Sequence, residues 1–220
     1  MEVKKLMIML VTGLLAASVS HAQLAPVSEQ TSVQISAQTQ ESSIEELNPF
    51  DPNIEQILND YDAEYERATG QSSHLAPSIF DILFDSGCSR FTCPVYLQVV
   101  KYTQTAYLYR NGQLTETWKV STGAPGHGTP NFDRHPNGRI YDKYSSKTYP
   151  GGNYNGLGNM PYAVFIEGGF AVHGTPQSNW KNLGRRASHG CIRVHPDNGY
   201  TFNRLVREFG VSNVWITVQN

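Results

Sequence analysis

The residues best suited to do chemistry in this chain are Cys191 and His173. Cys191 stands within SHGCIR at residues 188–193, and His173 stands upstream within VHGT at residues 172–175. The thiolate is the attacking form of a cysteine, and an imidazole within hydrogen-bond range generates or stabilises it near neutral pH. A free cysteine has a pKa of about 8.5, so such help is needed at pH 7. The pair therefore predicts covalent acyl transfer.

Both motifs need strands to bring them together. Fourteen residues separate His173 from Ser188, and the flanking residues are apolar, β-branched or aromatic, which predicts strands on either side. Residues 160–166 and 170–173 form two predicted strands around a glycine-containing turn, and the second strand ends at His173. A glycine follows His173, so little bulk blocks the approach of its ring to the thiol.

Taken together, HGT at residues 173–175 and SHGCIR at residues 188–193 resemble the signature of the L,D-transpeptidases of the YkuD type. The resemblance implies that Cys191 is the nucleophile and His173 the base, and that the backbone carbonyl of Gly174 or a neighbour fixes the imidazole tautomer. It also implies that peptidoglycan stem peptides are the substrate and that no cofactor is needed.

The reaction that the resemblance implies begins with attack of the thiolate on the carbonyl of the third stem residue. This attack expels the terminal D-alanine and forms a thioester, and the amine of a second stem resolves the thioester into a 3→3 cross-link. Water as the acceptor gives L,D-carboxypeptidase activity instead, and a lipoprotein lysine gives protein anchoring. The resemblance covers about residues 95–218 and leaves these three outcomes open.

The loop around Cys191 is expected to supply donors for the tetrahedral oxyanion. Gly190 has no side chain and lets the backbone expose consecutive amides, so the N–H groups of His189, Gly190 and Cys191 are the candidates. Ser188 and Gly174 belong to the same group of oxyanion or loop-orienting candidates. The ring of His189 either orients the loop or contacts the substrate.

Arg193 and Tyr162 are the candidate substrate-binding residues. If residues 191–194 are extended, the side chains of the nucleophile and of Arg193 project to one face. The Arg193 guanidinium then either binds a stem-peptide carboxylate bidentately or braces the loop, and the sequence favours neither role. His127 and His195 are expected to be structural or solvent-facing.

Three alternatives compete with this interpretation. One is a zinc site built from Cys191, His173, His189 and His195. That set lacks the paired ligand spacings typical of zinc sites, so no metal is expected. A non-catalytic module that only binds stem peptides is disfavoured by the intact Cys191 and His173. A papain-like protease places its nucleophile ahead of its histidine, which is the reverse of the order here.

The N-terminal residues predict export. Lys4 and Lys5 precede an apolar run from Leu6 to about Ala17, and a small-x-small cleavage site ends at Ala22. The run is shorter than the roughly 20 apolar residues of a membrane-spanning helix. We therefore expect a periplasmic protein that is not inserted in the membrane after cleavage.

Charge divides the chain into an acidic front and a basic back. Residues 1–87 hold three Lys or Arg and thirteen Asp or Glu, for a net charge of −10, whereas residues 88–220 hold fourteen and six, for a net charge of +8. A basic domain often binds nucleic acid, but export favours the carboxylates of peptidoglycan as its target. The positive charge either steers these carboxylates or lies scattered on a solvated surface, and no nucleic-acid partner is expected.

The three cysteines divide into a close pair and a single thiol. Cys88 and Cys93 bracket a short loop and are compatible with a disulfide in an oxidising compartment. So small a loop contributes about 2 kcal/mol by the chain-entropy estimate. Cys191 is left unpaired, and its Gly and His neighbours favour an open, reactive thiol over a buried inert one.

Four segments are predicted along the chain: a signal peptide at 1–22, a flexible linker at 23–50, an acidic helical extension at 51–87 and the catalytic domain at 88–220. The linker is rich in Gln, Ser and Thr and lacks the apolar density of a core. In the extension, apolar residues at helical spacing from Ile54 to Tyr65 predict a helix that Gly70 ends. Its acidic character favours docking on the basic domain.

The catalytic domain is predicted to be mainly β, a YkuD-like β-sandwich or barrel with one clear helix, preceded by a disordered spacer and a short helical extension. Further strands are expected at 95–101, 105–110, 113–121 and 214–218, and the helix at 196–209. Asn111-Gly112 predicts a tight hairpin. Residues 122–159 are dense in Gly, Pro and Asn, which predicts long loops, and part of them is expected to overhang the site as a lid.

Overall fold

A computed structural model describes residues 47–76, 87–145 and 152–220. The predicted signal peptide and most of the predicted linker lie outside the described residues. The elements, in chain order, are α1 (Ile54–Thr69), η1 (Arg90–Thr92), β1 (Val95–Val100), β2 (Thr105–Arg110), β3 (Gln113–Lys119), β4 (Phe132–Arg134), β5 (Val164–Glu167), β6 (Phe170–Gly174), η2 (Gln177–Asn182), β7 (Ile192–Val194), α3 (Pro196–Phe209), η3 (Val211–Asn213) and β8 (Val214–Gln219).

The strands form two sheets. The larger has five strands in the order β3-β2-β1-β8-β4, and the smaller has three in the order β5-β6-β7. The predicted antiparallel meander of β1, β2 and β3 is confirmed, and Asn111 and Gly112 take the positive φ values, 49° and 76°, that a tight hairpin turn requires. The last strand, β8, pairs parallel to β1 and antiparallel to β4, so it lies inside the sheet between these two strands.

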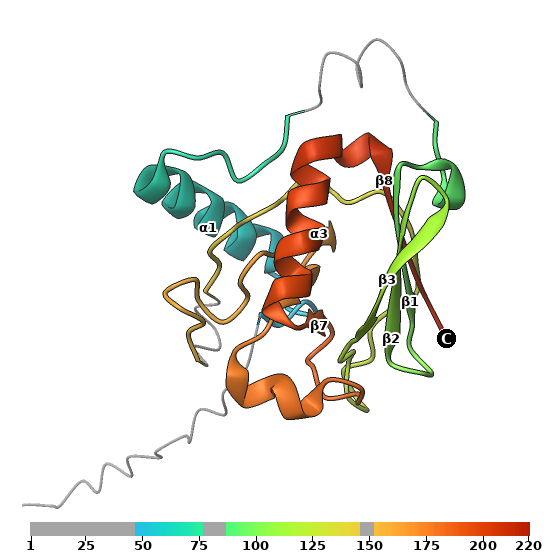
Figure 1. Cartoon of the computed structure of the whole chain (residues 1–220). Coiled ribbons are helices and arrows are strands. Elements are labelled where there is room, and N and C mark those ends of the chain that lie inside the picture. Colours follow the sequence, from blue (N-terminus) through green and yellow to red (C-terminus); the bar gives the residue numbers. More distant parts are fainter. Residues whose placement is uncertain (1–46, 77–86, 146–151) are drawn as a thin grey trace, which may run out of the picture. The chain divides into compact units, whose positions relative to one another are not determined.

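The main core lies between the two sheets and beneath α3. Alternate residues of each strand point into it, among them Leu97 of β1, Ile216 of β8 and Val172 of β6. Helix α3 contributes Phe202 and Val206, and Figure 1 shows it running alongside the five-stranded sheet. The mainly β fold predicted from the sequence is confirmed.

Helix α1 packs on the opposite face of the three-stranded sheet. Leu58 and Tyr65 are buried from the helix side and meet Phe165 and Ala171 from β5 and β6 in a second apolar cluster. The predicted stop at Gly70 is confirmed, since this residue ends the helix in the left-handed conformation with φ 66°. The three-stranded sheet is thus buried on both faces.

Three strands differ from the sequence prediction. Strand β5 begins at Val164 rather than at residue 160, because Pro161 carries no N–H to donate and Tyr162 has a positive φ of 59°, both of which interrupt an extended strand. Nothing in the sequence predicts β4, and the residues that flank the SHGCIR motif predict only an extended stretch where β7 lies; each strand has three residues.

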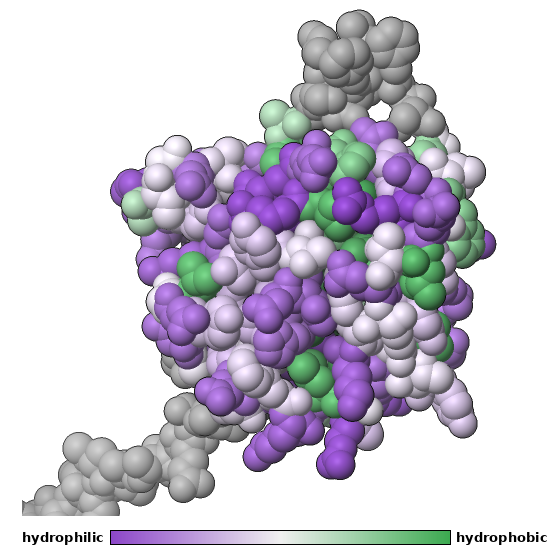
Figure 2. Space-filling model, viewed as in Figure 1, coloured by the Kyte–Doolittle hydropathy of each residue, from purple (hydrophilic) through white to green (hydrophobic). Residues whose placement is uncertain are grey.

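The exterior contrasts with these cores. On the face shown in Figure 2, hydrophilic and intermediate residues predominate and the hydrophobic ones are scattered.

Cys88 and Cys93 form a disulfide around the short turn η1, which settles the pairing that the sequence left open. None of the helices within residues 47–76, 87–145 and 152–220 has the length and hydropathy that a bilayer-spanning segment needs.

Candidate active site

The parallel pairing of β6 and β7 brings the two predicted catalytic segments together. His173 is the register partner of Arg193, and Cys191 directly precedes β7. Side chains two residues apart on a strand share a face, so His173 lies with Ala171, and Cys191 joins Ala171 in the apolar cluster on that face. With strands about 4.8 Å apart and a rise of about 3.3 Å per residue, the Cα atoms of His173 and Cys191 are roughly 8 Å apart, a gap that an imidazole can bridge.

The tautomer of His173 is set by the backbone. Its Nδ1 lies 2.7 Å from the carbonyl oxygen of Gly174, and its side chain is completely buried. A carbonyl only accepts hydrogen bonds, so Nδ1 carries the proton and Nε2 is the basic nitrogen of the neutral ring. Gly174 itself is clamped, because its N–H donates to Pro161 O at 2.8 Å.

Ser188 shapes the loop that carries the thiol. Its Oγ donates to the carbonyl of Cys191 at 2.6 Å and accepts the N–H of Gly190 at 3.2 Å. Gly190 has φ +123°, a conformation that a side chain strains, which is why a glycine stands there. The Gly190 N–H, an expected oxyanion donor, is therefore engaged by Ser188 in this state.

Thr129 is a supporting residue that the sequence did not single out. Its buried hydroxyl accepts the N–H of Gly123 at 2.8 Å and donates to the carbonyl of Gly190 at 2.6 Å. The turn from Gly123 to Thr129 is tightly packed, because a Cβ on Gly123 would be 1.8 Å from the carbonyl oxygen of His127. The only signal in the sequence is the high glycine content around residues 122–128, which predicts a loop but not its partner.

Arg193 adopts the bracing arrangement in this structure. Its Nη1 donates to the carbonyl of Ala187 at 2.9 Å, and its side chain is buried. Its backbone exchanges two hydrogen bonds of 2.9 Å with Ser121, which ties β7 to the segment after β3. A contact between Arg193 and a substrate carboxylate stays a prediction.

The expectation of an open thiol is wrong for this state of the protein. Cys191 is 1 % exposed, and its Sγ donates to the carbonyl of Gly169 at 3.3 Å. Cys191 shares its buried apolar cluster with Leu47 and Leu58, which come from the segment upstream of the β domain. Burial raises the pKa of the neighbouring Tyr144 phenol, with smaller contributions from Tyr61 and Cys191, so this hydroxyl stays protonated.

Comparison with known proteins identifies the domain that holds this site. A model of the YkuD L,D-transpeptidase catalytic domain matches residues 94–211, just over half of the chain. The chain belongs to the YkuD family. No curated protein matches it.

Several solved L,D-transpeptidases resemble the YkuD domain of this chain. One from Mycobacterium smegmatis is 22% identical with a TM-score of 0.47, over 58% of this chain and 59% of that one. One from Mycobacterium tuberculosis is 17% identical with a TM-score of 0.47, over 58% of each chain. One from Stackebrandtia nassauensis is 20% identical with a TM-score of 0.43, over 60% of this chain and 58% of that one. The chain spans less than two thirds of each of these proteins.

Tyr162 lies at the edge of the YkuD site rather than beside the thiol loop. It follows Pro161, whose carbonyl holds Gly174, and its ring contacts that of Tyr200 edge-on at 5.2 Å. Its left-handed backbone costs about 1–2 kcal/mol in a residue with a Cβ. The N–H of Tyr162 donates to Asp142 O at 3.0 Å, which helps to hold this conformation.

The remaining histidines of the YkuD domain lie at different distances from the site. The exposed ring of His127 contacts that of the half-buried His189 at 5.0 Å, so these two form one rim of the thiol loop. His195 caps α3 by accepting the N–H of Asp197 and packs on Trp180 at 4.4 Å. The structural role expected for His195 agrees with this placement.

The rival zinc set is not gathered in the YkuD domain. Within the described parts of the chain, the group of three potential ligands that lies close together is Cys88, Cys93 and His135. Two of these are joined in the disulfide, and Cys191 and His173 are not members.

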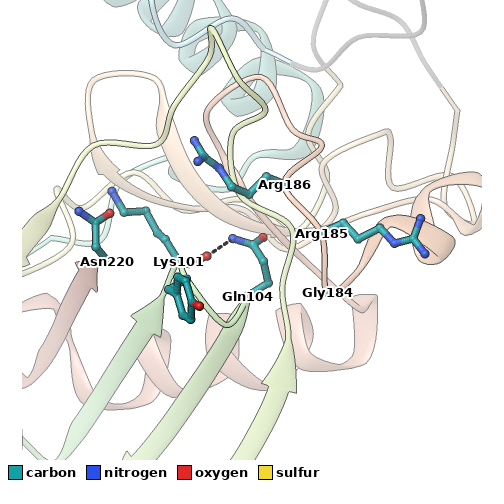
Figure 3. Close-up of a pocket in the computed structure, with 7 residues that line it drawn as sticks. Lys101, Gln104, Gly184, Arg185, Arg186 and Asn220 are labelled. Atoms are coloured by element: carbon teal, nitrogen blue, oxygen red, sulfur yellow. Dashed lines mark hydrogen bonds between the residues drawn. The ribbon is translucent and has the colours of Figure 1, made fainter.

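A separate pocket of about 350 Å³ gathers positive charge. Figure 3 shows its lining, which consists of Lys101, Tyr102, Gln104, Gly184, Arg185, Arg186 and Asn220. Burial lowers the pKa of Lys101, and the nearby Arg186 lowers it further. Arg185 and Arg186 in the lining belong to the segment that leads to Ser188, and Arg186 Nε donates to Gly123 O at 2.9 Å. Its lining includes neither Cys191 nor His173.

Proposed function

We propose that this protein is an exported L,D-transpeptidase that cross-links peptidoglycan stem peptides through a thioester on Cys191. The observation that carries the proposal is the hydrogen bond from His173 Nδ1 to Gly174 O, on the strand that pairs with the thiol segment. This bond selects the tautomer in which Nε2 takes the thiol proton. Membership of the YkuD family agrees with this chemistry.

In the first half-reaction, His173 Nε2 accepts the proton of Cys191, and the thiolate attacks the carbonyl carbon of the third stem residue. The C–S bond forms as the carbonyl π electrons move to oxygen. Collapse of this intermediate breaks the C–N bond to the terminal D-alanine, whose amine takes the proton from the imidazolium. The products are a thioester on Cys191 and free D-alanine.

In the second half-reaction, the amine of another stem attacks the thioester carbonyl and gives a proton to His173. The C–S bond breaks, an amide forms and the thiolate returns. Oxyanion stabilisation in both steps falls to the amides around Gly190, and each donor contributes about 3 kcal/mol in comparable sites. The Gly190 N–H must then exchange Ser188 Oγ for the oxyanion.

The test is mass spectrometry of tetrapeptide muropeptides incubated with the protein and with Cys191→Ala and His173→Gln variants. We expect D-alanine release and 3→3 dimers with the wild type only. Tripeptide without dimers would assign water as the acceptor and make the protein an L,D-carboxypeptidase. Unchanged muropeptides that still bind would favour the non-catalytic module.

A further inference from the structure

The segment that buries Cys191 comes from outside the family domain. The YkuD match begins at residue 94, whereas the covering residues run from Leu47 through α1 to Thr69. The sequence assigned residues 47–50 to the flexible linker, yet Leu47 is 1 % exposed and shares an apolar cluster with Cys191. We call residues 47–69 the cover.

The cover touches the backbone on both sides of the sulfur. A Cβ built on Gly169, whose carbonyl accepts the thiol hydrogen bond, would lie 2.7 Å from Ile54 Cγ1 and 2.8 Å from Pro49 Cα. A Cβ built on Gly190 would lie 2.7 Å from Pro49 Cγ. Pro49 and Ile54 therefore pack directly against two glycines, one that accepts the thiol hydrogen bond and one that precedes Cys191.

Phe50 of the cover adds aromatic contacts that reach from β6 to His127. The ring of Phe50 meets Phe170 edge-on at 5.2 Å and lies 6.5 Å from the ring of His127. Phe50 is nevertheless 47 % exposed, so it marks the outer border of the covered area. The reacting carbonyl must come within about 3–3.5 Å of the sulfur, which the docked cover prevents.

Polar contacts hold the cover in one position. The Arg139 side chain, which is 8 % exposed, donates to Asp62 at 3.0 Å, to Glu55 at 2.9 Å and to Asn59 at 2.6 Å, so three turns of α1 share one guanidinium. The Tyr141 hydroxyl also donates to Asp62. The cover is therefore specifically docked, and separating it from the domain leaves Arg139 without these partners.

We propose that residues 47–69 are an autoinhibitory cover that lies over Cys191 and is displaced when a stem peptide binds there. The proposal rests on the proposed function, because it takes Cys191 as the nucleophile. The docked form is latent, and turnover requires the cover to undock while the disulfide-linked β domain stays folded. Stem peptide and cover compete for one face of the β5-β6-β7 sheet.

Thiol labelling of the full chain tests the cover without relying on turnover. Cys88 and Cys93 are joined, so Cys191 is the one of the three cysteines that is not in a disulfide. We expect slow carboxamidomethylation of Cys191 by iodoacetamide in the wild type. In Leu58→Glu, which places a charge in the buried cluster, labelling should be faster by roughly tenfold or more.

The matched control is Ala63→Glu, which adds the same charge on the exposed side of α1. It should label like the wild type. Ile54→Ala is a milder variant that removes the contact with Gly169, and it serves if Leu58→Glu does not fold by circular dichroism. Wild-type labelling as fast as a free cysteine, or equal rates in all variants that fold, would overturn the cover.

Tetrapeptide turnover by the same proteins separates the two proposals. Faster labelling with faster turnover supports both. If the cover variants label faster than the wild type and no protein turns over substrate, the cover proposal is supported and the proposed transpeptidase function is rejected. If all proteins label at equal rates and the wild type turns over substrate, the cover proposal is rejected and the proposed function stands. Faster labelling with slower turnover shows that residues 47–69 help to bind substrate and overturns their inhibitory role.

Discussion

Ser188 joins the two backbone groups on either side of the catalytic turn, the carbonyl of Cys191 and the N–H of Gly190. Ser188→Ala leaves both without this partner in a buried loop, which costs about 1–3 kcal/mol of unfolding free energy. We expect kcat to fall while KM changes little, because the loop presents the thiol rather than the substrate. The control is Ser178→Ala, at an exposed position. Steady-state kinetics measures kcat and KM of both variants, and thermal melts measure their stability. Full kcat in Ser188→Ala would refute the positioning role.

Residue type and spacing predict which side chains carry the chemistry, and that assignment stays a prediction; the surroundings of these side chains could not be predicted. Cys191, His173 and Gly174 lie in two short motifs that the sequence exposes directly. Thr129 supports Gly190 across 61 residues, and a threonine before a proline carries no mark of such a contact. Cys191 shares its buried cluster with Leu47, which lies far upstream in a segment whose composition predicts a linker.

At the scale of elements, α3 positions the end of β6 by close approach. A Cβ on Gly199 would lie 2.9 Å from the backbone N of Gly174. Gly199→Ala therefore pushes α3 away from the strand that carries His173. The overpacking outweighs the better helix propensity of alanine, so the unfolding free energy should fall by about 1 kcal/mol or more.

Activity should fall with stability in Gly199→Ala, because the Gly174 carbonyl orients the His173 ring. Gly128→Ala is the matched control, since its new Cβ meets the nearest atom, Arg186 Nη2, at 3.6 Å. Chemical denaturation and turnover measure both effects. A Gly199→Ala protein as active and stable as the control would contradict this packing argument.

Asp133 connects η1 to the five-stranded sheet. Hydrogen bonds from Arg90, and after it Trp215 and Thr217, hold the pKa of Asp133 far below its usual range, although burial opposes them. A depressed folded-state pKa gives stability that is present above the unfolded value of about 3.9 and is lost as the pH falls towards the folded value. The stability gap between wild type and Asp133→Asn should thus shrink below about pH 4. Urea unfolding at several pH values measures it, and a constant gap would count against the assignment.

Long elements with clear punctuation were predicted well. The helix ended by Gly70 and the hairpin at Asn111-Gly112 follow from local backbone preferences. Strand β7 has three residues, and its parallel pairing with β6 is a tertiary property. The lid predicted in residues 122–159 stays a prediction, and residues 146–151 of that segment lie outside the described residues. The proposed cover, residues 47–69, lies upstream of it in the sequence.

At the scale of the whole molecule, the acidic front and the basic back meet where α1 docks. Arg139 binds Glu55 and Asp62, so part of the charge division in the sequence becomes a specific contact. The disulfide lies elsewhere, beside η1, which packs against β1 and β8. The disulfide and the docking site of α1 thus lie in different parts of the molecule.

This separation predicts a mild effect of losing the disulfide. The double variant Cys88→Ser, Cys93→Ser should lose at most about 2 kcal/mol of unfolding free energy, because the closed loop is short. Turnover should be retained, since the staple holds neither β6 nor β7. Equilibrium unfolding and turnover of the double variant measure both quantities, and loss of activity in a folded protein would disprove the separation.

The most direct measurement is the intact mass of the protein mixed with a tetrapeptide donor and quenched at early times, for the wild type and for Leu58→Glu. Our account predicts an adduct equal in mass to the donor minus D-alanine, located on Cys191, more abundant in Leu58→Glu and lost in His173→Gln. Two results would contradict it. One is D-alanine release with no adduct on Cys191, and the other is the absence of any adduct in both proteins while both remain folded.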